Sequence, residues 1–200
     1  MIGNNDNIVR IYADGACSGN QNDENYGGYG AILEFNGVQK EIYGAEKNTT
    51  NNRMELCAVI NALSLLKRNQ LTIHIFSDSS YVINCFKQRW YLSWQRNGWK
   101  NSKKQTVENK ALWSELLSLV NTQLCTFYKI KGHLTLDAQS AAFKAAHKKF
   151  NEENSLKFSE EEFSHVVSMN HRADALANVG ISELKESEQS AEPSADCSSI

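Results

Sequence analysis

Three runs of apolar and β-branched residues open the chain and predict three strands before any helix. They cover residues 8–13, 29–35 and 38–45. The first run ends in Asp14 and Gly15, which is typical of a strand followed by a turn, so we expect the Asp14 carboxylate to be half exposed at a strand end. Asn36-Gly37 between the other two runs is a strong hairpin signal. The pattern therefore predicts an antiparallel meander.

Helical spacing of apolar residues dominates the rest of the chain, with two further strands between the helices. The helices are expected at 53–67, 81–94, 105–120, 137–150, 158–167 and 170–179, and the strands at 71–76 and 124–130. We expect Gly180 to end the last helix, and residues 181–200, rich in Ser, Glu and Ala, to form a disordered acidic tail. This order of elements predicts a mixed α/β fold in one domain over residues 1–180.

Composition is consistent with one globular domain. The chain has 200 residues, 41% hydrophobic and 22% charged, and no apolar run approaches the ~20 residues that cross a bilayer. Residues 1–7 lack the charged and apolar regions of a signal peptide. The five cysteines are scattered and never form a CxxC pair, which argues against zinc and a disulfide framework. We therefore expect a cytoplasmic protein with reduced thiols and no membrane partner.

The net charge of −2 conceals an uneven distribution. Residues 181–200 hold five acids and one base, so the remaining residues carry 20 basic and 18 acidic side chains. Residues 87–110 hold seven bases and one acid, together with Trp90, Trp94 and Trp99. A solvated basic face with tryptophans in the core explains such a segment about as well as a surface for a nucleic-acid backbone.

Four acids stand where neighbouring elements could bring them together. Asp14 and Asp78 each end a predicted strand, Glu55 lies on the apolar stripe of a helix, and Asp174 lies on the last helix. Taken singly, these acids have simpler explanations: a turn for Asp14, and a helix cap by Asp78 or by Ser79. Taken together, four carboxylates repel one another and require cations. Hard oxygen ligands select Mg²⁺ or Mn²⁺, and two such ions suit phosphodiester hydrolysis.

Four short motifs carry a resemblance to a known family. They are Tyr12-Ala13-Asp14-Gly15, Asn51-Asn52-Arg53-Met54-Glu55-Leu56, Ser77-Asp78-Ser79-Ser80-Tyr81-Val82 and Arg172-Ala173-Asp174-Ala175-Leu176-Ala177. In this order they resemble the signatures of ribonuclease H type 1, over about residues 8–179. The resemblance implies a ribonuclease H-like α/β fold, a five-stranded mixed sheet flanked by helices. It also implies an endonuclease that hydrolyses the RNA strand of RNA–DNA hybrids, leaving 5′-phosphate and 3′-hydroxyl ends.

The resemblance also implies a role for each site residue. Asp14, Glu55, Asp78 and Asp174 would hold two Mg²⁺ ions, for which Mn²⁺ would substitute, and Asp14 would bridge both. Asp174 would complete the site that holds the attacking water, and Glu55 with Asp78 the site that faces the leaving oxygen. His133 matches a mobile-loop histidine that assists proton transfer or product release. We expect the protein to act as a monomer.

Further matched positions contact the substrate in the family. Near the cut they are Cys17, Asn20, Asn51 and Asn52, and in a pocket for a DNA phosphate they are Thr50 and Asn109. Trp90, Trp94, Trp99, Lys100, Lys103 and Lys104 resemble the family's basic handle, the name used below for these six residues. Two departures are evident, because Ser80 replaces a glutamine contact and residues 134–169 are inserted before Asp174.

Two other functions fit parts of this pattern. One is a catalytically silent hybrid-binding module of the same fold, which the presence of all four acids argues against. The other is a nuclease of the same general fold that prefers DNA, such as an integrase or junction resolvase. Those enzymes lack the Asn-Arg-Met-Glu-Leu signature and the basic handle.

Overall fold

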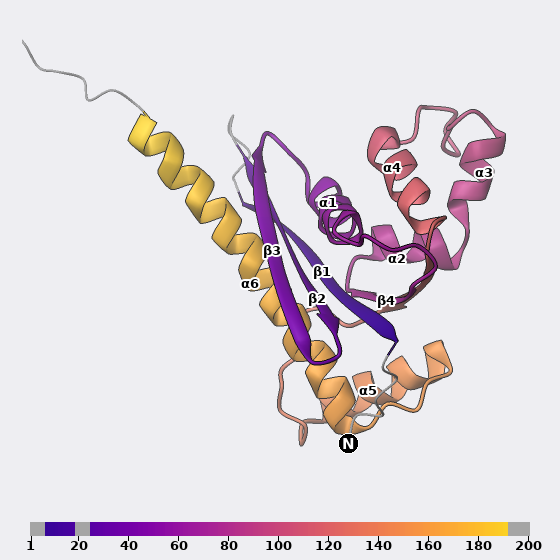
Figure 1. Cartoon of the computed structure of the whole chain (residues 1–200), viewed down its shortest axis with the longest axis vertical. Helices are drawn as coiled ribbons and strands as arrows, with labels where there is room; N and C mark the ends of the chain where they lie inside the picture. The colour runs from indigo at the N-terminus through magenta and orange to yellow at the C-terminus, as the bar shows by residue number, and fades with distance from the viewer. Residues whose placement is uncertain (1–6, 19–24, 192–200) are drawn as a thin grey trace, which may run out of the picture.

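The protein folds around a five-stranded mixed sheet flanked by six helices in the part of the chain that the computed structural model describes, residues 7–18 and 25–191 (Figure 1). The strands are β1 (Ile8–Ser18), β2 (Tyr26–Phe35), β3 (Val38–Lys47), β4 (Thr72–Ser77) and β5 (Leu124–Lys129). The helices are α1 (Asn51–Ser64), α2 (Ser80–Lys87), α3 (Trp90–Arg96), α4 (Lys110–Val120), α5 (Ala141–Asn154) and α6 (Glu160–Ala191). The sheet order is β3-β2-β1-β4-β5, and the predicted fold class is confirmed.

The register of the central strands sets two acids side by side. β1 pairs with β2 in antiparallel fashion and with β4 in parallel, and Tyr12 stands opposite Phe76. Asp14 and Asp78 each follow two residues later, so both lie at the same level of the sheet. Sites in α/β sheets form at the carboxyl ends of such strands.

The first strand does not end at Gly15, contrary to the prediction. β1 continues to Ser18, and Gly15 pairs with Tyr29 of β2. A Cβ atom on Gly15 would lie 2.5 Å from the backbone nitrogen of Glu55. The glycine is therefore required for the close approach of α1 to β1, and not for a turn. As a result, Asp14 is buried inside the strand with 6% of its surface exposed, instead of half exposed at a strand end.

Gly15→Ala is expected to destabilise the fold by about 1–3 kcal/mol, because the added methyl group must push α1 away from β1. The same displacement moves Glu55, so kcat should fall as well. Urea unfolding together with steady-state kinetics measures both effects. Gly37→Asn is the control, since asparagine tolerates the positive φ there and its Cβ meets no atom within 4 Å.

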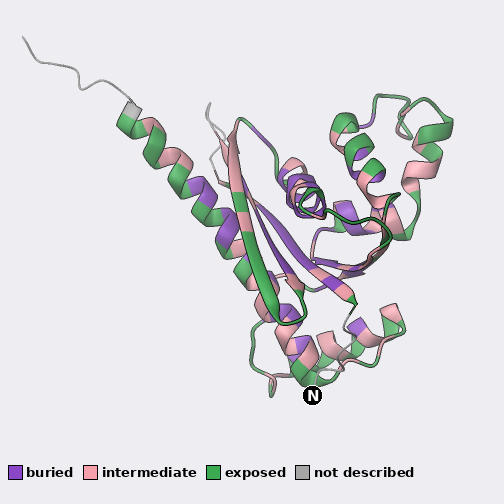
Figure 2. Cartoon of the chain, in the orientation of Figure 1, coloured by how far each residue is buried: buried purple, intermediate pink, exposed green. Residues whose placement is uncertain are grey.

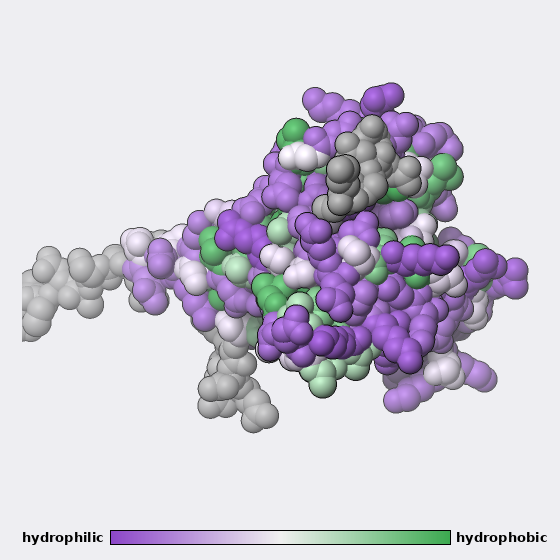
Figure 3. Space-filling model, turned by 90° about the horizontal axis from the view of Figure 1, so that it is seen from below, coloured by the Kyte–Doolittle hydropathy of each residue, from purple (hydrophilic) through white to green (hydrophobic). Residues whose placement is uncertain are grey.

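Each face of the sheet carries its own hydrophobic core (Figures 1 and 2). α1 and α4 cover one face, where Leu56, Ile75 and Trp113 are fully buried. α5 and α6 cover the other face, where the core contains Tyr12, Phe76, Phe143, Phe150 and Phe163. The inserted segment 134–169 supplies the last three of these aromatic residues and is therefore an integral part of the domain. The surface seen from below is largely hydrophilic, with small separate apolar patches (Figure 3).

The last helix is much longer than predicted. Residues 158–167 and 170–179 were expected as two helices ended by Gly180, but α6 runs unbroken through Gly180 to Ala191. A Cβ on Gly180 would lie 2.8 Å from the backbone oxygen of Gly44, so this glycine also serves a close approach, here to β3.

The end of α6 is anchored to the sheet by side-chain contacts. The Tyr43 hydroxyl donates to Glu183 at 2.8 Å, and Lys47 forms an ion pair with Glu188 at 3.3 Å. The prediction of a disordered tail is therefore wrong for residues 181–191. Residues 192–200 lie outside the described part of the chain.

Two other predicted helices differ from the structure. The helix expected at 81–94 is divided into α2 and α3 by Arg89, whose φ of 55° breaks the helical path. The helix expected at 105–120 begins only at Lys110, after Asn109 with φ also 55°. Between α3 and α4 the chain forms a loop closed by a bridge between Lys100 and Thr106. This loop carries the lysines of the basic handle away from the sheet.

Candidate active site

Three of the four predicted acids meet at one point. Asp14 comes from β1, Glu55 from the second turn of α1, and Asp78 from the residue after β4, and one ligand atom from each lies within 4.8 Å of the others. Asp78 is not the cap of α2, because the Ser79 hydroxyl accepts the capping hydrogen bond from the Val82 backbone N–H at 3.3 Å. Its carboxylate therefore remains available to the cluster of three, which we call the acid trio.

Burial and mutual repulsion raise the pKa of each carboxyl in the acid trio. For Asp14, burial and then the charges of Asp78 and Asp174 raise the pKa to about 8, although the Gly15 N–H donates to its Oδ1 at 2.8 Å. Burial and then Asp14 and Asp78 raise the pKa of Glu55 well above its usual range. Burial also raises the pKa of Asp78, against the lowering effect of nearby His133. Such a cluster favours a bound cation or bound protons.

The donor set of the acid trio fits a hard divalent cation. Glu55 is 5% exposed, and its Oε2 is buried without a hydrogen-bond partner among the described residues. Its Oε1 accepts a long hydrogen bond from Asn51 Nδ2, at 3.4 Å. An unpaired buried carboxylate oxygen is costly unless a cation or proton satisfies it. Three carboxylates without a cysteine are the ligands that Mg²⁺ and Mn²⁺ prefer.

Asp174 lies beside the acid trio but outside it. Its charge raises the pKa of both Asp14 and Asp78, so it is close enough to act on them. It is half exposed on α6, does not join the group whose ligand atoms lie within 4.8 Å, and accepts from Asn178 Nδ2 at 3.2 Å. The structure therefore brings three predicted ligands together and places the fourth at the rim.

The loop after β5 passes directly over Asp78. A Cβ on Gly132 would lie 2.1 Å from Asp78 Oδ2, so any side chain at this position would have to displace the Asp78 carboxylate. The next residue, His133, is exposed and has a φ of 49°. Its charge is the first among the influences that lower the pKa of Asp78, so the imidazole lies within electrostatic reach of that carboxylate.

Several predicted substrate contacts surround the start of α1. Thr50 caps this helix by accepting from the Arg53 N–H at 3.3 Å, and Asn51 and Asn52 form its first turn. Cys17 is exposed on β1 and contacts the backbone oxygen of Thr49 through its Sγ at 3.8 Å. Asn109 immediately precedes α4 and has a buried Nδ2 without a partner among the described residues, whereas Asn20 lies outside them.

The basic handle combines a packed and a solvated half. Trp90, Trp94 and Trp99 are partly buried against the core, and the ring of Trp94 lies 5.4 Å from that of Trp113. Lys100, Lys103 and Lys104 are exposed. Core packing thus explains why this segment contains three tryptophans, whereas the three lysines are exposed to solvent.

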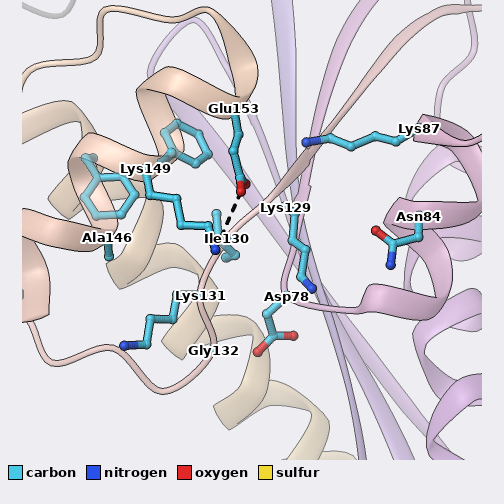
Figure 4. A pocket seen from close by; sticks show the side chains of 12 residues that line it. Asp78, Asn84, Lys87, Lys129, Ile130, Lys131, Gly132, Ala146, Lys149 and Glu153 are labelled. Atoms are coloured by element: carbon cyan, nitrogen blue, oxygen red, sulfur yellow. Dashed lines mark ion pairs between the residues drawn. The ribbon is translucent and has the colours of Figure 1, made fainter.

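Four lysines line a cavity beside Asp78, an arrangement that the sequence did not reveal. A cavity of ≈ 730 Å³ borders Asp78 and is lined by Lys87, Lys129, Lys131 and Lys149, among others (Figure 4). The only sequence signal was the Ala- and Lys-rich composition of residues 137–150. Nothing in that composition indicates that α5 faces the carboxyl end of β4.

No helix in the described ranges 7–18 and 25–191 is long and apolar enough to cross a membrane.

Comparison with known proteins identifies the family. A family model described as RNase H matches residues 6–151, most of the chain. A protein named Ribonuclease H from Thermoanaerobacter sp. (strain X514) is 51% identical over 132 residues, which are 66% of this chain and 83% of that one. One from Francisella tularensis subsp. novicida (strain U112) is 52% identical over 127 residues, 64% of this chain and 80% of the relative.

A solved structure extends the likeness past the end of the family match. The solved structure is LC9-RNase H1, described as a type 1 RNase H with the type 2 active-site motif. The superposition covers 81% of this chain and 82% of LC9-RNase H1, with 29% sequence identity and a TM-score of 0.58. The family match contains Asp14, Glu55 and Asp78, the three acids that the fold brings together. The chain therefore belongs to the ribonuclease H family and is a nuclease of that family.

Proposed function

We propose that this ribonuclease H hydrolyses the RNA strand of RNA–DNA hybrids by a two-metal-ion mechanism, leaving 5′-phosphate and 3′-hydroxyl ends. The observation that carries the proposal is the acid trio, in which Glu55 Oε2 is buried and has no hydrogen-bond partner within residues 7–18 and 25–191. One solved relative of the same fold, LC11-RNase H1, is described in complex with an RNA/DNA hybrid, at 17% identity and a TM-score of 0.50. The proposed cofactor is Mg²⁺, with Mn²⁺ as a substitute.

Each residue of the site has a proposed task. Asp14, Glu55 and Asp78 hold the cations, and Asp174 completes the set from the rim. When bound, the ions activate a water molecule and stabilise the charge that develops on the leaving oxygen. His133, exposed on its loop, carries a proton to or from the site. Glu55, at the start of α1, is placed to contact a ribose 2′-hydroxyl, the group that separates RNA from DNA.

One cleavage assay tests the proposal against its alternatives. Labelled RNA–DNA hybrid, double-stranded RNA and double-stranded DNA are each incubated with Mg²⁺, with Mn²⁺ or with EDTA. We expect cutting of the RNA strand of the hybrid alone, blocked by EDTA. Equal cutting of DNA would favour a DNA nuclease of the same fold, and binding without cutting would favour a silent hybrid-binding module.

Charge reversal in the basic handle should weaken substrate binding more than turnover. We expect Lys103→Glu with Lys104→Glu to raise KM by about tenfold or more at low salt and to leave kcat within about twofold, because phosphate contacts supply affinity and not chemistry. Steady-state kinetics at several salt concentrations measures this change. Lys67→Glu with Arg68→Glu is the matched control, since both side chains are exposed just after the end of α1 that is remote from Glu55. Equal effects of the control and the handle variant would contradict a substrate-binding role for the handle.

A further inference from the structure

The inserted segment builds one wall of a cavity that opens beside Asp78. The cavity has a volume of ≈ 730 Å³ and lies between α2, the end of β5 with the loop after it, and α5. Figure 4 shows the Asp78 carboxylate at one side of this space, with α5 facing it across the cavity. The space therefore borders one member of the acid trio, and α5, which belongs to the inserted segment, forms its opposite wall.

Positive charge predominates around this cavity. Lys87 comes from α2, Lys129 from β5, Lys131 from the loop and Lys149 from α5. The acids in the lining are Asp78, which belongs to the acid trio, and Glu153, which pairs with Lys149 at 3.6 Å. Lysine ammonium groups that converge from separate elements form a site for phosphate groups, which they bind as point charges.

The cavity is held in shape by packing and by a contact across it. Phe150 and Phe163 line it and are 3% and 1% exposed, so α5 is fixed to the aromatic core beneath the sheet. Lys87 Nζ donates to Asn154 Oδ1 at 2.8 Å and so joins α2 to the end of α5. A fixed wall positions the lysines before any ligand arrives, which reduces the entropic cost of binding.

We propose that this lysine-lined cavity binds backbone phosphates of the nucleic-acid substrate outside the position that is cut. The inference rests on the proposed function, because it takes the acid trio as the point of cleavage. The cavity borders Asp78 itself, whereas α3 and the loop that carry the basic handle lie elsewhere in Figure 1. The insertion thereby gives the enzyme a second phosphate-binding surface that is independent of the handle.

The chain offers a matched pair of variants for the test. Lys148 and Lys149 are neighbours on α5, and each pairs with a glutamate one turn later, at 3.8 Å and 3.6 Å. Of these two lysines, Lys149 lines the cavity and Lys148 does not. We expect Lys149→Gln to raise KM for a long hybrid several-fold and to flatten the slope of log KM against log salt by about 0.9 per lost contact, with kcat unchanged. Lys148→Gln should change neither quantity.

The outcomes separate this inference from the proposed function. If wild-type protein does not cut the hybrid, the proposed function fails and this inference fails with it. If wild-type protein cuts but Lys149→Gln behaves as Lys148→Gln does, the cavity is not a substrate site and the proposed function stands. A third measurement is the inhibition of hybrid cleavage by added inorganic phosphate. If Lys149→Gln weakens this inhibition and leaves KM for the hybrid unchanged, the cavity binds a free anion, and the assignment to backbone phosphates is overturned. Thermal unfolding of both variants shows whether α5 remains in place.

Discussion

Asp14→Asn is expected to lower kcat for hybrid cleavage by on the order of 10⁴ while leaving hybrid binding intact. Asp14 belongs to the acid trio: its charge raises the pKa of Glu55, and burial and then Asp78 and Asp174 raise its own pKa. Loss of a group that acts as part of a catalytic unit costs about as much as loss of the unit. Asparagine keeps the shape of the side chain and removes the charge that holds a cation.

Two measurements distinguish this result from simple unfolding. Hybrid affinity, measured by fluorescence anisotropy with Ca²⁺ or without metal, should remain within a few-fold of wild type. The free energy of unfolding without metal should stay close to that of wild type near pH 7 and exceed it above pH 8, because Asp14 has a pKa of about 8 and asparagine cannot acquire the buried charge. Asp137→Asn, which removes an exposed loop carboxylate, is the control and should retain activity. Cleavage by Asp14→Asn at a rate near wild type would show that the acid trio is not the catalytic site.

The five strands and their positions between the helical segments followed from the sequence, because the spacing of apolar residues reflects which side of an element is buried. The sequence indicated that two strands each deliver an acid, and of the four acids expected to converge the structure brings Asp14, Glu55 and Asp78 together and leaves Asp174 outside the group. For α2 the sequence left Asp78 and Ser79 as alternative caps, and the structure shows Ser79 accepting the local hydrogen bond from the Val82 N–H. These features depend on residues close in the chain or on a regular repeat.

The two elements whose ends were predicted wrongly at a glycine, β1 and α6, share one physical cause. Gly15 and Gly180 were interpreted as chain breaks, yet each is a place where a helix approaches a strand too closely for a Cβ. A glycine in a turn and a glycine under a packed helix look the same in one sequence, because the difference lies in a distant segment. The burial of Asp14 and the full length of α6 both depended on that distinction.

The contribution of the inserted segment to the core and to the cavity does not follow from the sequence, for a related reason. Its composition is Ala- and Lys-rich, and its three core phenylalanines are widely spaced among polar residues. Only the tertiary structure shows that Phe143, Phe150 and Phe163 pack on the sheet and that Lys149 faces Asp78 across a cavity. Charge placement of this kind is set by helix orientation, which the sequence pattern of a short helix specifies weakly.

Removal of divalent metal should make the stability of the protein fall as pH rises from 5 to 8. Asp14 has a pKa of about 8 in the folded protein against an ordinary value of 3.8, and Glu55 and Asp78 are shifted in the same direction. Between these values the unfolded chain has lost the proton that the folded chain still binds. Unfolding therefore releases protons, and the free energy of unfolding falls by up to about 1.4 kcal/mol per pH unit for each such proton.

Urea unfolding in EDTA at pH 5, 6.5 and 8 measures this slope. Asp14→Asn should flatten it, whereas Asp137→Asn should leave it unchanged. Added Mg²⁺ should restore stability, by about 2.7 kcal/mol when its concentration is 100 times its Kd. The gain should be larger at pH 8 than at pH 5, because a cation binds the ionised carboxylates and must displace protons at lower pH. A metal effect that is absent at pH 8, or equal in wild type and Asp14→Asn, would exclude the acid trio as the metal site.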